Sequence, residues 1–325
     1  MRSKTVLYPW GKSKTSLGKY KKIARPVYDL APEEHVSRNV DHVRLKRDAM
    51  DDIGAYEERR FPEFRNPTLD TLDLGKTKHH IPLLLEVDIT KAREHMRESK
   101  AKTGEGLSFT GWVMKCIGQA VSEHKYIQAM RRGRKSLILF DDVDISVVVE
   151  RSVNHSDNSS ETLPMPYVVR RANKKTVKEI NDEIRTAQRE TPGAGEVQLG
   201  VHRNVNLTKA FTLMPRFVRN LFVWRRLTKD PFFAKKKMGT VVVTSMGSTG
   251  VYSGYGWAIP IGIHPAVFAL GSIARKPGVV GDEITIREYL SMTVLFDHDV
   301  TDGAPVFRFI QRLNELLEDG YGLYG

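Results

Sequence analysis

The stretch "YLSMTVLFDHDVTDGAPVFRF" at residues 289–309 decides how the C-terminal part of the chain is interpreted. It opens with an apolar run rich in β-branched and aromatic residues, which predicts a strand. A polar turn follows, and the apolar spacing after Ala304, with Pro305 in the first turn, predicts a helix. His298 stands in the turn, four residues before Asp302. We therefore expect His298 at the end of a strand, where connecting segments commonly carry function.

The residues of this turn have an ordinary and a functional interpretation. In the ordinary one, His298 is a partly exposed loop histidine and Asp302 is a helix N-cap whose carboxylate accepts amide hydrogen bonds. In the functional one, His298 is a general base, the usual role of neutral imidazole near neutral pH. Nearby carboxylates would raise the pKa of such a base. Because successive side chains of an extended segment point to opposite faces, we expect Asp297 and Asp299 to face away from the site that His298 enters.

The composition limits the class of protein. The chain has 325 residues, 40% of them hydrophobic, which suits one large domain or two small ones. It contains no apolar run of about 18 residues, so we expect no membrane-spanning helix. Its one cysteine, Cys116, excludes an intrachain disulfide and fits a reducing compartment. Cys116 lies in an apolar helical pattern, so we expect it to pack as a small buried hydrophobe.

The charge of the chain points to an anionic partner. The formal net charge is +12, which suits nucleic acid, a membrane surface, an acidic protein or a phosphorylated cofactor. Nucleic-acid binding would rest on charge alone, because no groove-reading motif is recognisable. The N-terminus is basic, with no acid before Asp29, and lacks the apolar segment of a secretory signal. We expect a cytoplasmic location, with an organelle matrix as the alternative.

The order of predicted elements gives the domain organisation. Residues 1–76 are charged and weakly periodic, and we interpret them as an N-terminal extension with no independent domain. Residues 77–325 alternate strand and helix patterns, which predicts one α/β domain. Predicted strands lie at 79–89, 135–140, 143–150, 165–170, 239–248 and 289–296, and predicted helices at 88–99, 108–124, 176–190 and 304–320. In the last helix one face carries apolar side chains, at Val306, Ile310, Leu313 and Leu317.

Several segments together resemble a known family. The His-x-x-x-Asp-Gly pattern at 298–303 resembles the active-site motif of the chloramphenicol-acetyltransferase-like superfamily. It is more similar to the catalytic domain of the dihydrolipoamide acyltransferases, the core component of 2-oxo-acid dehydrogenase complexes, which carries Asp-His-Arg-x-x-Asp-Gly-Ala before a C-terminal helix. This chain reads "DHDVTDGA". Other segments that resemble the family follow in its order, at 79–95, 108–129, 143–150, 165–184, 239–250 and 259–273. The ordered set covers roughly residues 77–320 and is much more specific than the motif alone.

The resemblance implies a fold and a mechanism. The fold would be α/β, a mixed sheet flanked by helices, with the active site between the subunits of a trimer or a multiple of trimers. His298 would be the general base for a thiol of coenzyme A or dihydrolipoamide, whose thiolate attacks an acyl thioester. A hydroxyl from a strand of the neighbouring subunit would stabilise the oxyanion; that hydroxyl falls on Thr244, with Ser245 next to it. Their ordinary role would be strand-end hydroxyls that bond to the backbone.

The resemblance also implies the supporting residues and the ligands. Asp302 would fix the loop around His298, and Gly303 would permit a tight backbone there. Gly303 and Gly247 are the glycines we expect at the coenzyme A site. Coenzyme A is expected as a substrate, with a lipoyl group on another protein or an acyl carrier protein as the other carriers. We expect no metal, because one cysteine and the pairs His79–His80 and His298–Asp302 form no tetrahedral ligand set.

This sequence departs from the family pattern at three points. Asp299 stands where the family has arginine, which reverses a charge beside the base. Thr244 replaces the family's serine and has a stiffer side chain. The 76 residues before the catalytic region are too few, and of the wrong character, for a lipoyl domain and a subunit-binding domain together. The alternative hypothesis is therefore a non-catalytic scaffold or assembly subunit that has kept the fold.

The segment at 214–239 is both apolar and strongly basic. Its spacing predicts a helical face formed by Phe217, Leu221, Trp224 and Leu227 or Phe222. One interpretation is a helix that packs on the core and has a solvated basic edge. The other is an amphipathic surface element for anionic lipid or an acidic carrier protein. The same charge could also serve the phosphates of coenzyme A.

Overall fold

The computed structural model describes residues 56–59, 61, 65–104, 106–154, 160–189, 211, 213–245 and 256–324, without the side chains of 150–164. The chain divides into two compact units, Met1–Phe61 and Pro62–Gly325. All of the described helices and strands lie in the second unit. Helix α1 (Asn66–Gly75) belongs to it although the sequence predicted no helix there. The expected boundary between residues 76 and 77 stays a prediction.

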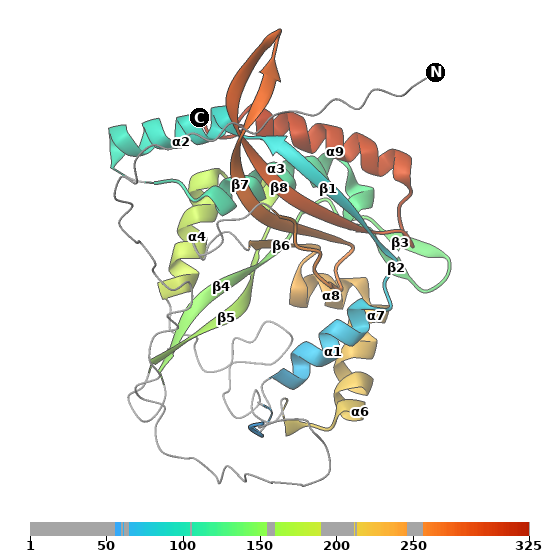
Figure 1. Cartoon of the computed structure of the whole chain (residues 1–325). Helices are drawn as coiled ribbons and strands as arrows, with labels where there is room; N and C mark the ends of the chain where they lie inside the picture. The colour runs from blue at the N-terminus through green and yellow to red at the C-terminus, as the bar shows by residue number, and fades with distance from the viewer. Residues whose placement is uncertain are drawn as a thin grey trace, which may run out of the picture. The chain divides into compact units, whose positions relative to one another are not determined.

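Six strands form one mixed sheet in the order β1–β8–β7–β6–β4–β5 (Figure 1). β6 runs parallel to β4 and to β7, and the other neighbours are antiparallel. The fold class expected from the sequence, an α/β mixed sheet flanked by helices, is confirmed. The bounds of the strands are β1 His80–Asp88, β4 Ile145–Asn154, β5 Ser160–Val169, β6 Val241–Ser245, β7 Ala266–Val280 and β8 Glu283–Asp297.

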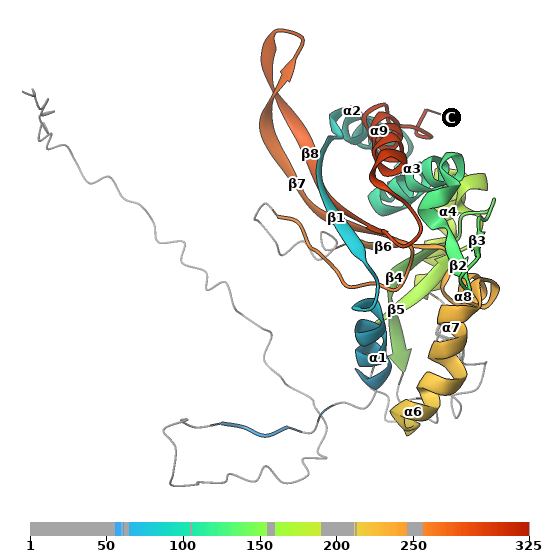
Figure 2. The same cartoon turned by 90° about the vertical axis from the view of Figure 1, so that its right-hand side faces the viewer.

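Four helices cover one face of this sheet (Figure 2). They are α2 (Thr90–Thr103), α3 (Phe109–Glu123), α4 (Val177–Arg189) and α9 (Gly303–Glu318). The Ser108 hydroxyl accepts a hydrogen bond from the Gly111 amide at 3.2 Å and so caps the start of α3. Cys116 is buried in this layer, as predicted, and burial raises the pKa of its thiol. The apolar stripes of α3 and α9 therefore form the main core together with one row of strand side chains, at Val147, Val243, Phe268, Val294 and Leu83.

The other face of the sheet is only partly covered. Leu84 and Val148, whose neighbours in sequence point into the core, are exposed on this face. Residues 256–264 cross part of it, and the Trp257 indole N–H donates to the Leu85 carbonyl at 2.9 Å. Apolar side chains therefore remain exposed on the face opposite the helices.

A second, smaller core lies beside the sheet. It is formed by Met130, Leu227, Ala234, Met238 and Ile263, with Leu74 of α1 packed against them. The elements around it are β2 (Met130–Arg132), β3 (Ser136–Ile138), α6 (Arg216–Arg219), a π-helical turn (Asn220–Trp224), α7 (Arg225–Lys229) and α8 (Pro231–Met238). The remaining elements among the described residues are two 3₁₀ turns, at Lys125–Gln128 and Ala172–Lys174. No described helix is long and apolar enough to cross a bilayer.

The strands β7 and β8 are much longer than the sequence predicted. Each has 15 residues, whereas the apolar run in the sequence identified only 289–296 of β8. Beyond the sheet they continue as a two-stranded hairpin (Figure 1), and its side chains Val279, Ile284 and Ile286 are exposed. Ile284 and Ile286 alternate with polar residues in the sequence, but this part of the hairpin has no buried face and was not predicted as a strand.

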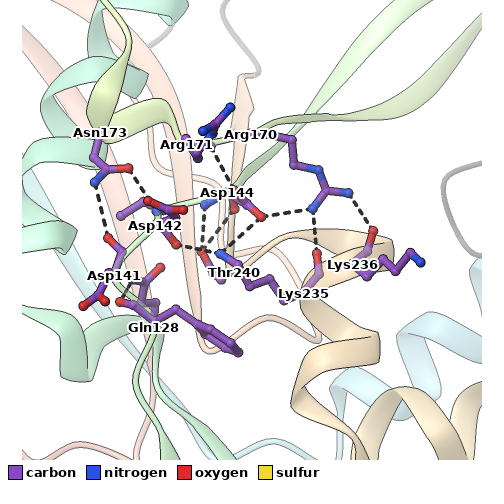
Figure 3. Close-up of polar contacts among 12 residues, drawn as sticks. Gln128, Asp141, Asp142, Asp144, Arg170, Arg171, Asn173, Lys235, Lys236 and Thr240 are labelled. Carbon is purple, nitrogen blue, oxygen red and sulfur yellow. Dashed lines mark hydrogen bonds and ion pairs between the residues drawn. The ribbon is translucent and has the colours of Figure 1, made fainter.

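A polar network fixes the turn that leads into β6 (Figure 3). The buried Asp144 carboxylate accepts from Arg170 at 3.0 Å, and its backbone carbonyl accepts from the Thr240 amide at 2.7 Å. The Arg170 guanidinium also donates to the Lys235 carbonyl at 2.7 Å, at the end of α8. Gly239 has φ +80°, and a Cβ there would lie 2.6 Å from the Asp144 carbonyl oxygen, so only glycine fits. The network therefore ties α8 and the start of β6 to the start of β4.

Candidate active site

His298 lies just beyond the end of β8, in the turn 297–302 that leads into α9, which we call the His298 turn. Its backbone N–H donates to the His79 carbonyl at 3.0 Å, and the Val300 N–H donates to the Asp297 carbonyl at 3.1 Å. The backbone of the turn is therefore tied to β1 and to β8. The imidazole itself is exposed, with its ring centre 6.3 Å from that of Phe296. A rigid backbone thus presents an accessible ring, as the sequence predicted.

The two flanking aspartates are occupied by other partners. Asp297 is buried, and its carboxylate lies 2.8 Å from the Lys78 ammonium and accepts the Asp299 amide at 3.2 Å. The Asp299 carboxylate lies 2.9 Å from His79 Nδ1 and 4.0 Å from the Arg131 guanidinium. The hydrogen bond from His79, with Coulombic help from that histidine and from Arg131, lowers the pKa of Asp299. Among the described contacts both carboxylates are paired with Lys78, His79 or Arg131 and neither is hydrogen-bonded to the His298 ring.

The partners of Asp299 explain why aspartate suits this position better than the arginine of the family motif. Arginine at this position would lie beside Arg131 and Lys78, whereas aspartate complements them. The charge reversal at 299 is therefore matched by the basic side chains around it. Asp299 thus interacts with three basic side chains: Lys78, His79 and Arg131.

Asp302 and Gly303 begin α9. Asp302 is the N-cap with extended backbone angles, but its exposed carboxylate makes no side-chain cap hydrogen bond. Its backbone carbonyl accepts from the Val306 amide at 3.4 Å. Gly303 does not have a positive φ, and a Cβ there would meet only the Phe307 ring, at 3.9 Å. The expected need for glycine in a tight backbone is therefore not borne out within one chain, and the carboxylate of Asp302 points to solvent.

Thr244 and Ser245 end β6, and Gly247 lies outside the described residues. Thr244 pairs with Ala269, and Ala269 pairs with Thr293, in the row that also contains Leu84. This row points to the sheet face opposite the helices, whereas Ser245 has the parity of the core-facing Val243. Of the two hydroxyls, the strand alternation therefore directs Thr244 towards the open face.

The sheet register separates Thr244 from His298 within one chain. Thr244 is level with Thr293 of β8, two strands away, and His298 lies five residues further along. Strand spacing and rise per residue then give a separation of roughly 20 Å. The two side chains cannot act on one reacting group of a single chain, so a joint site requires two chains.

Two further histidines lie beneath the turn. The buried His264 has its Nε2 2.9 Å from the Met238 carbonyl, to which it donates, and burial lowers its pKa to about 4. His80 Nε2 donates to the His264 carbonyl at 2.8 Å, and burial lowers the pKa of His80 as well. Both rings are therefore neutral at pH 7. They contribute hydrogen bonds, and Lys78 contributes the positive charge beside Asp297.

A cavity of about 70 Å³ adjoins the turn on the side of Asp297. Its wall is largely apolar and includes Met130, Leu227 and Ile263, with Lys78 and Arg131 among the polar residues. The lining includes Asp297 and Val300 of the turn but not His298, so the cavity does not adjoin the imidazole. Within the part of the chain that the structure describes, no group of three or more His, Cys, Asp or Glu side chains is placed to hold a metal ion.

Three residues of the site were not identified as functional from the sequence: Lys78, His79 and Arg131. Lys78 and His79 precede β1, and Arg131 belongs to β2, so all three are distant from residue 298 in sequence. The basic run at 76–80 was the only available signal. It becomes informative once β1 is known to pair with β8.

Comparison with known families and proteins gives consistent matches. The model of the family described as 2-oxoacid dehydrogenases acyltransferase (catalytic domain) matches residues 54–193 and 234–324. The chain is 27% identical over 256 residues to the lipoamide acyltransferase component of the branched-chain alpha-keto acid dehydrogenase complex of Bacillus subtilis (strain 168), covering 76% of this chain and 49% of that protein. It is 41% identical over 100 residues to the dihydrolipoyllysine-residue acetyltransferase component of the pyruvate dehydrogenase complex of Acholeplasma laidlawii, covering 29% and 18%. The chain thus spans half or less of the length of these relatives.

Solved structures share the fold. The cubic core of a pyruvate dehydrogenase multienzyme complex superposes with a TM-score of 0.58 at 18% identity, covering 84% of this chain and 96% of that one. A probable dihydrolipoamide acetyltransferase from Listeria monocytogenes 4b F2365 gives 0.54 at 20% identity, covering 81% and 94%. The dihydrolipoamide acetyltransferase of Azotobacter vinelandii, solved in an investigation of a serine, a histidine and an asparagine in its catalytic mechanism, gives 0.58 at 18% identity, covering 84% and 96%.

Proposed function

The chain belongs to the family of 2-oxoacid dehydrogenase acyltransferase catalytic domains, and from that premise we propose that it moves an acyl group between a thioester and a thiol, with His298 as the general base. The observation that carries the proposal is the His298 turn. An accessible imidazole stands on a hydrogen-bonded backbone, and the two adjacent carboxylates are bound by Lys78 and His79. Such a ring is free to accept a proton from a substrate.

The residues perform the transfer in two proton steps. The His298 imidazole removes the proton of the acceptor thiol, and the thiolate attacks the carbonyl carbon of the acyl thioester. The resulting tetrahedral oxyanion needs a hydrogen-bond donor, which the Thr244 hydroxyl supplies. When the oxyanion collapses, the carbon–sulfur bond of the donor breaks and the departing thiolate takes the proton back from the imidazolium. The acyl group has then moved, and His298 is neutral again.

The hydroxyl comes from a second subunit. Thr244 points to the open face of the sheet and lies roughly 20 Å from His298 along the sheet of its own chain. Leu84 and Val148 expose apolar surface on the same face, which suits contact with another copy. A homotrimer, or a multiple of trimers, would bring the Thr244 of one chain to the His298 of the next.

Asp302 is a positioning residue in this proposal. Its carboxylate is exposed in the single chain and stands four residues after His298. In the Azotobacter enzyme named above, the asparagine stands four positions after the histidine. A hydrogen bond that the Asp302 carboxylate accepts from a neighbouring backbone N–H, formed when the subunits meet, would hold the turn. Gly303, and Gly247 outside the described residues, stay candidates for close approach of the coenzyme A arm.

The substrates follow from the family. We propose coenzyme A thioesters as acyl donors or products, with a lipoyl group or an acyl carrier protein on another chain as the second carrier. The single cysteine supports a reducing compartment, and we propose a cytoplasmic location.

A scaffold function without catalysis is the second candidate. Asp299 and Thr244, which depart from the family motif, are the observations that favour it. Against it, Asp299 is matched by Arg131 and His79, and threonine retains the hydroxyl donor.

The proposal is tested by measuring transfer from a panel of acyl-coenzyme A thioesters to dihydrolipoamide. We expect turnover by the wild-type chain and a loss of about 10²–10⁴-fold in kcat for His298→Ala. The exposed ring should leave the free energy of unfolding and the oligomeric mass unchanged. Undiminished turnover by His298→Ala would exclude this residue as the base. Absence of turnover by the wild type over the whole panel, with an intact oligomer, would favour the scaffold.

A further inference from the structure

The α6–α7 segment, residues 216–229, sets this chain apart from its family. The family match covers 54–193 and 234–324, so the whole segment lies in the unmatched interval 194–233. We propose that its outward face binds the surface of an anionic lipid bilayer. This face is formed by Phe217, Leu221, Phe222, Arg225, Arg226 and Lys229. The proposal concerns a surface distant from the His298 turn and does not depend on acyl transfer.

The inner face of the segment is firmly held. Arg219 Nε lies 2.6 Å from the Asp70 carboxylate of α1, and the Trp224 indole N–H donates to the same carboxylate at 3.0 Å. Arg219, Trp224 and Leu227 are all buried. The segment is thereby fixed to α1, and the outward side chains cannot turn inward to replace those already packed.

The π-helical turn explains which side chains point outward. The sequence predicted one face formed by Phe217, Leu221, Trp224 and Leu227 or Phe222, and this is wrong. Residues 220–224 follow the i→i+5 pattern, which brings Arg219 and Trp224, five residues apart, onto the buried face. Phe217 and Leu221 are consequently turned to solvent. The segment therefore has a core-packing face, as one interpretation expected, and in addition an exposed apolar face.

The outward face exposes an unusual amount of apolar surface. Phe217 is 73% exposed, Phe222 67% and Leu221 52%, and Leu213, just before the segment, is 64% exposed. Large apolar side chains clustered in this way usually mark a contact surface. Within the second unit, α6 lies at the end opposite α2 and α9 in both views (Figures 1 and 2).

Of the three cations on this face, Arg226 lies 4.0 Å from the Asp230 carboxylate, and the other two have no described carboxylate to neutralise them. Arg225 and Lys229 are exposed and have no acidic partner among the residues that the structure describes. Asp70 and Asp73 of α1, the nearest acids on the inner side, are engaged by Arg216 and Arg219. The net charge of +12 adds a long-range attraction to anionic surfaces.

This combination favours lipid over an acidic protein. An amphipathic helix on a membrane buries its apolar side chains at the acyl boundary and places Arg and Lys among the phosphates. Here both kinds of side chain project from one helical segment, and no described element covers them. An acidic peptide would instead use the depression beside the segment, lined by Leu74, Phe217, Trp224 and Arg225 among others.

The experiment is vesicle flotation with the full chain. Vesicles of phosphatidylcholine alone are compared with vesicles that also contain phosphatidylglycerol, at low and high salt. We expect binding only to the anionic vesicles, weakened by salt. Phe217→Ser/Phe222→Ser should reduce the partition coefficient roughly tenfold or more. Arg225→Glu/Lys229→Glu should reduce it by a similar factor. Both variants should keep the wild-type thermal midpoint and oligomeric mass.

Matched controls decide between the outcomes. Ile284→Ser/Ile286→Ser removes exposed apolar side chains from the β7–β8 hairpin, and Lys178→Glu reverses an exposed charge on α4; both should bind like wild type. The proposal is overturned if anionic vesicles do not bind, or if the controls lose as much binding as the segment variants. It is also overturned if the Phe217/Phe222 variant binds normally while polyglutamate competes with the vesicles, the result expected of acidic-protein docking. A fall in oligomeric mass of that variant without any vesicle binding would identify the face as a self-interface.

Discussion

Two ion pairs, each with a buried carboxylate, hold two different parts of this molecule. Lys78–Asp297 lies beneath the His298 turn, and Arg219–Asp70 lies beneath the α6–α7 segment. The first supports a turn that the family match includes, and the second supports a segment that it omits. In both places an ion pair fixes the backbone and leaves the side chains above it exposed. The same kind of contact therefore supports a site that the family match includes and a surface that it omits. Loss of either ion pair should destabilise the fold, whereas only loss of the pair beneath the His298 turn should lower activity.

Removing one partner of each ion pair gives the strongest test of this difference between stability and activity. Lys78→Met leaves the buried Asp297 carboxylate without its ammonium, and Asp70→Ala removes the carboxylate that Arg219 and Trp224 share. We expect each to lower the free energy of unfolding by about 3 kcal/mol, measured in urea. Under conditions where both variants are folded, only Lys78→Met should lower kcat for acyl transfer.

Exposed neighbours provide the controls for this pair of variants. Lys76→Met and Asp73→Ala remove partners of surface ion pairs and should each cost less than about 1 kcal/mol. An equal loss of kcat in Lys78→Met and Asp70→Ala would show that the two regions do not act separately.

Thr244 and Ser245 offer a second test at the inherited site. Loss of an oxyanion donor typically lowers kcat by about 10²–10³-fold, which we expect for Thr244→Ala. Ser245 has the core-facing parity, so Ser245→Ala should stay within about threefold of wild type. Thr244→Ser retains the hydroxyl and should preserve most of the activity. A larger effect at Ser245 than at Thr244 would reverse the assignment of the donor.

His264 makes the support of the His298 turn sensitive to acid. Burial holds the pKa of this ring at about 4 in the folded chain, against 6.5 for an ordinary histidine. Between these values the unfolded chain binds more protons, so the folded state loses stability as the pH falls from 6.5 to 4, by up to about 3 kcal/mol. His264→Gln, which keeps an N–H donor for the Met238 carbonyl, should flatten this part of the stability profile. An unchanged acid slope in His264→Gln would show that other groups cause it.

Asp299→Arg restores the family residue and gives the smallest expected effect. The new guanidinium would face Arg131 and lose the hydrogen bond from His79, so the turn should loosen and kcat fall roughly tenfold. Asp299→Asn, which removes the charge without adding a cation, should have a kcat between those of the wild type and Asp299→Arg. A gain of activity in Asp299→Arg would instead show that the site of this chain is impaired by its aspartate.

The sequence predicted the elements whose burial follows a clear period. The helices α3 and α9 and the strands β1 and β8 were all identified, because each has one buried face. The position of His298 at a strand end followed from the same pattern. The sequence alone did not show that Thr244 and Ser245 point to opposite faces of the sheet. That distinction comes from the strand register of β6.

The missed features depend on contacts between distant segments or on a broken period. Lys78, His79 and Arg131 reach the His298 turn only through pairing and packing that no local pattern encodes. The π-helical turn shifts the phase of the α6–α7 segment, so a regular helical period assigned Phe217 to the wrong face. The hairpin of β7 and β8 has no buried face beyond the sheet, and the short alternation of Ile284 and Ile286 with polar residues was not recognised as a strand.

Mixing two inactive variants tests the central claim that each site combines His298 of one chain with Thr244 of another. His298→Ala and Thr244→Ala chains are denatured together, refolded as mixed oligomers and assayed for transfer from acyl-coenzyme A to dihydrolipoamide. In a ring of identical interfaces, random mixing pairs an intact His298 with an intact Thr244 at about a quarter of the sites, so about a quarter of wild-type activity should return. Activity that stays at the level of the separate variants, in oligomers shown to contain both chains, would contradict a site shared between subunits.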